Sequence, residues 1–127
     1  MANETKLVRR LQDRLNEVTV ANDTGIEKGA ILELTDVNTG ALSSGTGIFA
    51  GIAASEKVAS DGSTRLAVWN EGIFDITASA ASITVGDLVK IDGVNLVSTT
   101  TTAEDAIGTA MQDAATSEVI LIHVGRF

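Results

Sequence analysis

Two stretches of this sequence, 57 positions apart, share one pattern of glycine and aliphatic residues. They read IEKGAILEL at Ile26–Leu34 and ITVGDLVKI at Ile83–Ile91, and each has a glycine at its fourth position. Gly and aliphatic matches that persist in order favour an internal duplication over chance. A unit that stacks on its own copy can bury a continuous core between the two copies. The pattern therefore predicts a body made of two similar halves.

The repeat extends well beyond these two stretches. The same spacing pairs Val37 with Val94. After the Asp61-Gly62 turn we align Leu66–Val68 with Val119–Leu121, a spacing of 53, as if the second copy lacked four loop residues. We expect one body over residues 21–127, with the two halves at about 25–74 and 82–127.

Strand signals dominate this body. Val, Ile and Thr are frequent and Gly recurs, which is typical of short strands joined by tight turns. Asp92-Gly93 is a strong signal for a two-residue hairpin turn, whereas Asn38–Gly47 reads as a mobile loop. The predicted strands are Ala30–Val37, Gly47–Ala53, Thr64–Trp69, Ile73–Thr77, Leu88–Ile91, Val94–Ser98, Ala106–Met111 and Glu118–Val124. We predict a mainly β fold, a small β-barrel or tulip-like sandwich made of two similar halves.

The N-terminal segment has a different character. Glu4–Val18 contains no Gly or Pro and has apolar residues at helical spacing, so we predict an N-terminal helical arm over residues 1–20. A helix of about 15 residues is marginal in water unless its apolar stripe is buried. The stripe packs either on its own body or on a neighbouring subunit. Its residues, Leu7, Val8, Leu11, Leu15 and Val18, are candidate contacts with another subunit or a partner.

The composition argues against enzyme chemistry. The 127 residues include no cysteine and one histidine, His123, which excludes thiol nucleophiles, disulfides and histidine-pair metal sites. His123 lies in the apolar run Val119–Val124, where a half-buried structural role is expected. Adjacent carboxylates such as Glu104-Asp105 point to opposite faces of a strand. We expect no catalytic residue, no metal site and no cofactor.

The charge is unevenly distributed. The chain carries a net charge of −8, with 17 acidic and nine basic residues. Residues 1–20 are net +1, so residues 21–127 carry the remaining −9. An acidic body repels phosphate backbones, which disfavours direct nucleic-acid binding. No apolar run approaches 18 residues and the N-terminus is charged, so we expect neither a membrane span nor a signal peptide.

Aromatic residues are scarce, at 3% of the chain. Stacking sites for bases or sugars need several exposed aromatic rings, which this sequence does not offer. Trp69 lies on the opposite strand face from Leu66 and Val68. It is either a core residue of the second face or an interface anchor of the kind enriched at binding hot spots.

Several runs in order resemble a family of short tailed-phage capsid decoration, or cement, proteins. The resemblance covers roughly residues 19–127, and it rests on Asn22–Leu34, Phe49–Ala53, Ala67–Phe74, Ile83–Val89, Ile107–Ala110 and Glu118–Ile120. It implies a small β-rich protein with a barrel-like or tulip-like fold and no catalytic residue. The N-terminal segment is a departure, since such proteins usually begin close to the first strand.

The resemblance also implies a partner and a place. Such proteins sit on the outside of the capsid, commonly as trimers where major capsid protein subunits meet. We therefore expect a structural virion protein, a homotrimer that binds the major capsid protein and is made in the host cytoplasm. Two other classes stay open: a tail, baseplate or fibre module, and a small-ligand or carbohydrate-binding module.

Overall fold

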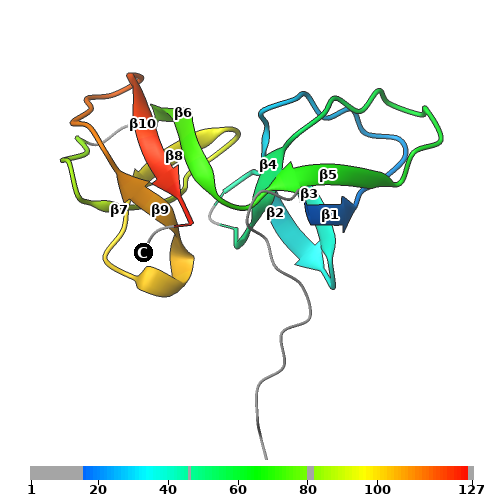
Figure 1. The fold of residues 1–127 in the computed structure, drawn as a ribbon, viewed down its shortest axis with the longest axis horizontal. Coiled ribbons are helices and arrows are strands. Elements are labelled where there is room, and N and C mark those ends of the chain that lie inside the picture. The colour runs from blue at the N-terminus through cyan, green and yellow to red at the C-terminus, as the bar shows by residue number, and fades with distance from the viewer. Residues whose placement is uncertain (1–15, 46, 80–81, 126–127) are drawn as a thin grey trace, which may run out of the picture.

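A computed structural model of the chain describes residues 16–45, 47–79 and 82–125. Within these ranges the chain forms ten β-strands and one short 3-10 helix (Figure 1). The elements are β1 Asn16–Thr19, β2 Ile31–Asp36, β3 Thr39–Leu42, β4 Phe49–Ala53, β5 Arg65–Trp69, β6 Gly72–Ala78, β7 Leu88–Ile91, β8 Leu96–Thr99, η1 Ala103–Asp105, β9 Ala106–Ala110 and β10 Val119–Val124. The predicted mainly β fold is confirmed.

The strands form two closed barrels that lie side by side. In the first barrel the order is β1-β3-β2-β4-β5, and β5 returns to pair with β1. In the second the order is β6-β8-β7-β9-β10, and β10 returns to pair with β6. Both barrels have one parallel pair, β1 with β3 and β6 with β8, among antiparallel ones. The two barrels therefore have the same topology.

Local backbone features recur at the spacing of 57. Isolated β-bridges join Ile26 to Lys57 in the first barrel and Ile83 to Ala114 in the second. In each barrel the turn between the second and third strands holds an asparagine with positive φ. Asn38 has φ 47°, and its counterpart Asn95, 57 residues later, has φ 58°. Asparagine tolerates this left-handed conformation better than most residues.

The spacing after the Asp61 turn differs from the predicted one. Ala53 pairs with Val68, and the corresponding Ala110 pairs with Ile122, so this part of the repeat is shifted by 54 residues. Val68 and Ile122 are both fully buried, whereas a spacing of 53 would match Val68 with Leu121, which is 37% exposed. The predicted spacing is wrong by one residue, and the second barrel lacks three loop residues. A shift of one residue exchanges the buried and exposed faces of a strand. Because β10 is apolar on both faces, the hydrophobic pattern fits either alignment.

Each half closes on itself, where one joint barrel or sandwich was predicted. Gly72–Ala78 form β6 of the second barrel, so the described barrels span 16–69 and 72–124, in place of halves at 25–74 and 82–127. The reason lies in the edges. The last strand of each half pairs with the first strand of the same half, which leaves no open edge for the other half to extend.

The predicted arm over residues 1–20 overlaps the first barrel. Asn16–Thr19 form strand β1, antiparallel to β5, so this end of the predicted helical segment is wrong. Residues 1–15 lie outside the described residues. Pairing with β5 sets the conformation of this short segment, in preference to its local helical pattern. Removing residues 2–18 would therefore delete most of a barrel strand.

Two turn predictions also change. The predicted mobile loop Asn38–Gly47 contains strand β3, which pairs with β2. The Asp92-Gly93 hairpin is present between β7 and β8, but its turn is longer than two residues: the Asp92 N–H donates to the carbonyl of Leu96 at 2.9 Å, and residues 93–95 lie between them. The turn ends with the left-handed Asn95, which contacts the first barrel.

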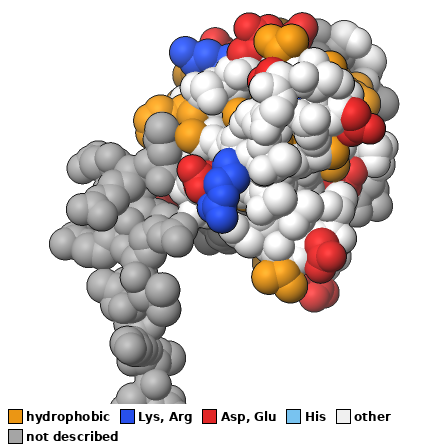
Figure 2. All heavy atoms as spheres, turned by 90° about the vertical axis from the view of Figure 1, so that its right-hand side faces the viewer, with side chains coloured by type: hydrophobic (Ala, Val, Ile, Leu, Met, Phe, Trp, Pro, Cys, Tyr) orange, Lys and Arg blue, Asp and Glu red, His pale blue; other side chains and the backbone are white. Residues whose placement is uncertain are grey.

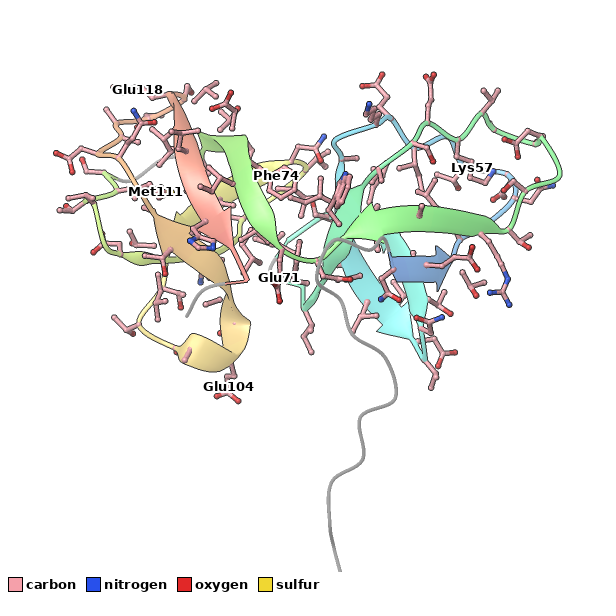
Figure 3. All side chains as sticks on the ribbon, viewed as in Figure 1. Lys57, Glu71, Phe74, Glu104, Met111 and Glu118 are labelled. Atoms are coloured by element: carbon pink, nitrogen blue, oxygen red, sulfur yellow. The ribbon has the colours of Figure 1, made fainter. Side chains whose placement is uncertain are left out.

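Each barrel has its own core, and the two barrels share an apolar contact. Leu32, Val18 and Val68 belong to the buried core of the first barrel. Ile31 and Ile52 point the other way and belong to the buried cluster of the second barrel. Phe49 and Phe74 pack against that cluster, and Phe74 lies between the barrels in Figure 3. The barrels therefore form one body.

Candidate interaction surfaces

The structure tests a small part of the predicted apolar stripe. Leu7, Val8, Leu11 and Leu15 lie outside the described residues. Val18 was a candidate contact, but it is 2% exposed and sits in the core of the first barrel. Val18 is therefore unavailable to a partner. In β1 the side chains alternate between the two faces, and Val18 faces inward.

Trp69 is the last residue of β5 and pairs with Ile52 of β4. Its side chain is 39% exposed on the outer face of the first barrel. The sequence left two alternatives for Trp69, a core residue of the second face or an interface anchor. Its position leaves a large part of the ring accessible to a partner, as an interface anchor requires. Its counterpart in the second barrel is His123, which pairs with Thr109.

A larger apolar surface lies on the second barrel. Five aliphatic side chains are 37–60% exposed on β6, β10 and the loops beside them: Ile73, Val85, Met111, Val119 and Leu121. We call these residues the apolar face. On β10 the outward positions alternate with the buried Ile120, Ile122 and Val124. Exposed apolar side chains grouped on one side of a protein are a candidate interaction site.

The strand register brings these residues together. Leu121 lies opposite Asp75 of β6, and His123 lies opposite Ile73. Figure 1 shows β6 and β10 next to each other at the front of the second barrel. Val85, Met111 and His123 line a hollow of about 270 Å³ beside this face. Met111, labelled in Figure 3, lies on the side of the barrel away from the first one.

The corresponding face of the first barrel is polar. The position of Val119 is held there by Arg65, whose guanidinium donates to the carboxylate of Glu17 at 2.7 Å. Both side chains are exposed, at 67% and 53%, so this pair contributes little to stability. The position of Leu121 is held by Ala67. The two barrels share a topology but differ at these two outward positions.

Figure 2 shows the outer end of the first barrel. Its acidic side chains are separated by uncharged surface, and its hydrophobic side chains form small, separate groups. Such a surface suits solubility and offers no extended apolar contact. It contrasts with the apolar face of the second barrel.

The buried cation of the first barrel has a structural role. Lys57 is 3% exposed, and its ammonium donates to the carbonyls of Asn22 and Val58 and to the carboxylate of Asp61. All three donors are therefore used. The Ser63 N–H, followed by the Lys57 ammonium, holds the pKa of Asp61 below its ordinary 3.8. The group closes a loop of the barrel around the Ile26–Lys57 bridge.

Two further features are absent from the residues that the structure describes. Among residues 16–45, 47–79 and 82–125, no group of three His, Cys, Asp or Glu side chains is placed to hold a metal ion. In the same part of the chain, no helix is long and apolar enough to cross a membrane.

Sequence reasoning missed the apolar face, although one signal was available. The run VILIHV at Val119–Val124 is almost entirely apolar, whereas a strand with one solvent-facing side should alternate. A strand that is apolar on both faces requires cover on both. The barrel core covers one face, and nothing in the described chain covers the other.

Comparisons with known proteins give one finding. A family model described as phage cement protein matches residues 12–125, nearly the whole chain and all ten strands. Comparison with curated proteins gives no match. The match covers both barrels and therefore includes the apolar face and the contact between the barrels. The chain belongs to the phage cement protein family, and its role in the virion capsid is structural.

Proposed function

We propose that this protein decorates the outer capsid surface as a homotrimer that bridges major capsid protein subunits. It stabilises the head against the outward pressure of packed DNA. The observation that supports this most directly is the apolar face on the second barrel, whose outward positions Val119 and Leu121 correspond to Arg65 and Ala67 on the first barrel. A shell protein that covers the apolar face removes it from water, which is favourable.

The fold suits a clamp. Two closed barrels with a shared apolar contact form a stiff body without an exposed sheet edge of their own. A trimer carries three apolar faces, and once one is bound the others rebind at high local concentration. Because the protein binds the assembled shell, it shifts the equilibrium away from capsid opening by mass action.

The test is binding to undecorated capsids. Purified protein is mixed with heads that lack it, and the bound fraction is measured by co-sedimentation. Val119→Lys with Leu121→Lys should lower the apparent affinity by more than tenfold, because burying each side chain is worth roughly 1.5–3 kcal/mol. The matched control is Ala67→Lys, at the position equivalent to Leu121 on the first barrel, which should bind as the unmodified protein does.

Two results would contradict the proposal. One is binding that is unchanged by the double substitution and reduced by Ala67→Lys. The other is unmodified protein that stays in the supernatant with capsids and sediments instead with isolated tails.

A further inference from the structure

The contact between the two barrels contains a specific polar lock. The side-chain oxygen of Asn95, in the β7–β8 turn, accepts a hydrogen bond from the Ile31 N–H at 2.8 Å. The Asn95 N–H donates to the hydroxyl of Ser43 at 3.0 Å, and the Gly93 N–H donates to the carbonyl of Gly45 at 3.1 Å. Ser43 is fully buried by this contact and its surroundings. A turn of one barrel thus plugs a site on the other.

The second barrel has the equivalent site, and no turn from residues 16–45, 47–79 or 82–125 occupies it as the Asn95 turn occupies the site on the first barrel. The repeat places Leu88 at the position of Ile31, Thr100 at that of Ser43, and Thr102 at that of Gly45. Thr100 keeps the hydroxyl that Ser43 provides. Thr100 and Thr102 border an open hollow of about 460 Å³, which Asp87, the neighbour of Leu88, also lines together with Lys90 and Asp105.

The acceptors of this hollow can take further hydrogen bonds. The Thr100 hydroxyl oxygen accepts from the Thr102 N–H at 3.1 Å, and the Thr102 carbonyl accepts from the Asp105 N–H at 3.1 Å. A hydroxyl or carbonyl oxygen has two lone pairs, so each keeps capacity for a second donor.

The first barrel carries the matching plug. Asn38, in the β2–β3 turn, stands where Asn95 stands in the second barrel, and both have positive φ. The Asn38 carbonyl is held by the Thr19 N–H at 2.8 Å, while the residue itself is exposed. The adjacent Val37 is 89% exposed, the largest value among the exposed large hydrophobic side chains.

The free plug and the free hollow lie on different barrels. Figure 1 shows the β2–β3 turn at the foot of the first barrel, and Figure 3 places Glu104, next to the hollow, at the foot of the second. The body is held together by the contact already described, so one chain cannot join its own Asn38 to its own hollow. A second copy of the chain can supply a hollow for the Asn38 turn and a turn for the Thr100 hollow.

We propose that the Asn38 turn of one copy docks into the Thr100 hollow of the next, as the Asn95 turn docks on the first barrel within each chain. This deepens the proposed function, because it rests on a trimer and names its interface. The contact is head-to-tail, so it propagates until it closes. Three copies would then form a ring of six barrels. Contacts of the Asn95 turn within a chain would alternate around the ring with contacts of the Asn38 turn between chains.

The external contact is the weaker of the two. The internal one includes Phe49 and Phe74, and the repeat replaces these with Ala106 and Asn16. Less apolar area is buried, so the free energy of association is smaller. We therefore expect a trimer that dissociates on dilution while each monomer stays folded.

Engineered disulfides test this contact, because the natural chain has no cysteine. In the variant Asn38→Cys with Thr100→Cys, oxidation should give covalent dimers and trimers on a non-reducing gel, and no larger species. The positive control is Asn95→Cys with Ser43→Cys, whose backbone nitrogen and hydroxyl are 3.0 Å apart; it should cross-link within the monomer. Asn38→Cys alone should give at most dimers.

Each other outcome is decisive. If the control pair closes while the Asn38–Thr100 pair stays monomeric, the proposed contact is wrong. A ladder that continues beyond the trimer would overturn the closed ring. The hollow could instead hold residues 1–15 of the chain. In that case deleting residues 2–15 would sharply increase cross-linking, which would overturn docking as the resting state.

Trimer formation and capsid binding depend on different residues, so they can be tested separately. Asn38→Gly, which keeps the left-handed turn, should lower the mass in light scattering from three times the 13.1 kDa chain towards one, without changing the melting temperature. Val119→Lys with Leu121→Lys should weaken capsid binding and leave that mass unchanged. Monomers that bind capsids through the apolar face would refute the ring and keep the decoration role.

Discussion

Replacing Gly108 by alanine should damage the second barrel at the pairing of β9 with β10. A methyl group at this position would lie 2.8 Å from the Cα of Val124 and 2.9 Å from the carbonyl carbon of His123, and it would also overlap the His123 carbonyl oxygen. These are backbone atoms of a paired strand, so they cannot move aside as a side chain can. We expect a loss of about 3 kcal/mol or more in the free energy of unfolding.

Thermal and urea unfolding followed by circular dichroism measure this loss. A change of about 3 kcal/mol should lower the melting temperature by roughly 10 °C in a chain of this size. The matched control is Gly45→Ala, where nothing lies within 4 Å of the added methyl, and it should stay within about 0.5 kcal/mol. If Gly108→Ala melts together with this control, the register of β9 and β10 is wrong.

Four further predictions concern the first barrel and the contact between the barrels. Gly51→Ala should cost as much as Gly108→Ala, because its methyl would lie 2.7 Å from Val68 and its φ is +144°; a cost under about 1 kcal/mol in urea unfolding would refute the equivalence of the two glycines. Asn95→Gly keeps the left-handed turn but removes the acceptor of the Ile31 N–H, so urea unfolding should show a loss of about 1–2 kcal/mol, and no loss would mean that the lock is not formed. Lys57→Met should cost about 1–3 kcal/mol in the same measurement, since its buried carbonyl partners lose their donor; an unchanged midpoint would count against it. The lowered pKa of Asp61 means that its stabilisation is complete above pH 3.8 and is lost as the pH falls through the lower folded-state pKa, so Asp61→Asn should lose less stability between about pH 5 and about pH 2 than the unmodified chain, and equal losses would contradict this.

Most strands of the two barrels could be predicted from the sequence, but β1 and β3 could not. β3 has the sequence TGAL, which lacks the β-branched and aromatic residues that favour strands. The sequence does predict a strand at its counterpart β8. The alignment of Val37 with Val94 also aligns Thr39–Leu42 with β8, which indicates a strand there. The repeat was therefore a better guide than local propensity, because pairing with β2 determines the conformation of this segment.

The first strand was hidden by a helical pattern. The apolar spacing of 3, 4 and 3 that ends at Val18 is typical of a helix, and it drew Asn16–Thr19 into the predicted arm. In the structure Val18 instead follows the alternation of a strand, buried between exposed neighbours. Four residues are too few for local pattern alone to separate a helix from a strand, and the partner that decides, β5, lies almost 50 residues away.

The interaction surfaces were predicted least well. The stripe of the N-terminal segment lies largely outside the described residues, and Val18 is part of the core. The apolar face needed knowledge of which side of β10 the barrel covers. The plug and the hollow needed the internal contact of Asn95 as a template, which no linear pattern reveals.

In the proposed function, the apolar face of the second barrel binds the outside of the capsid. A cryo-electron microscopy map of undecorated heads mixed with the purified protein tests it most directly. We predict three copies around each decorated position, with Val119 and Leu121 turned towards the shell. A map in which these residues face solvent, or in which the heads stay bare at saturating protein, would contradict the account.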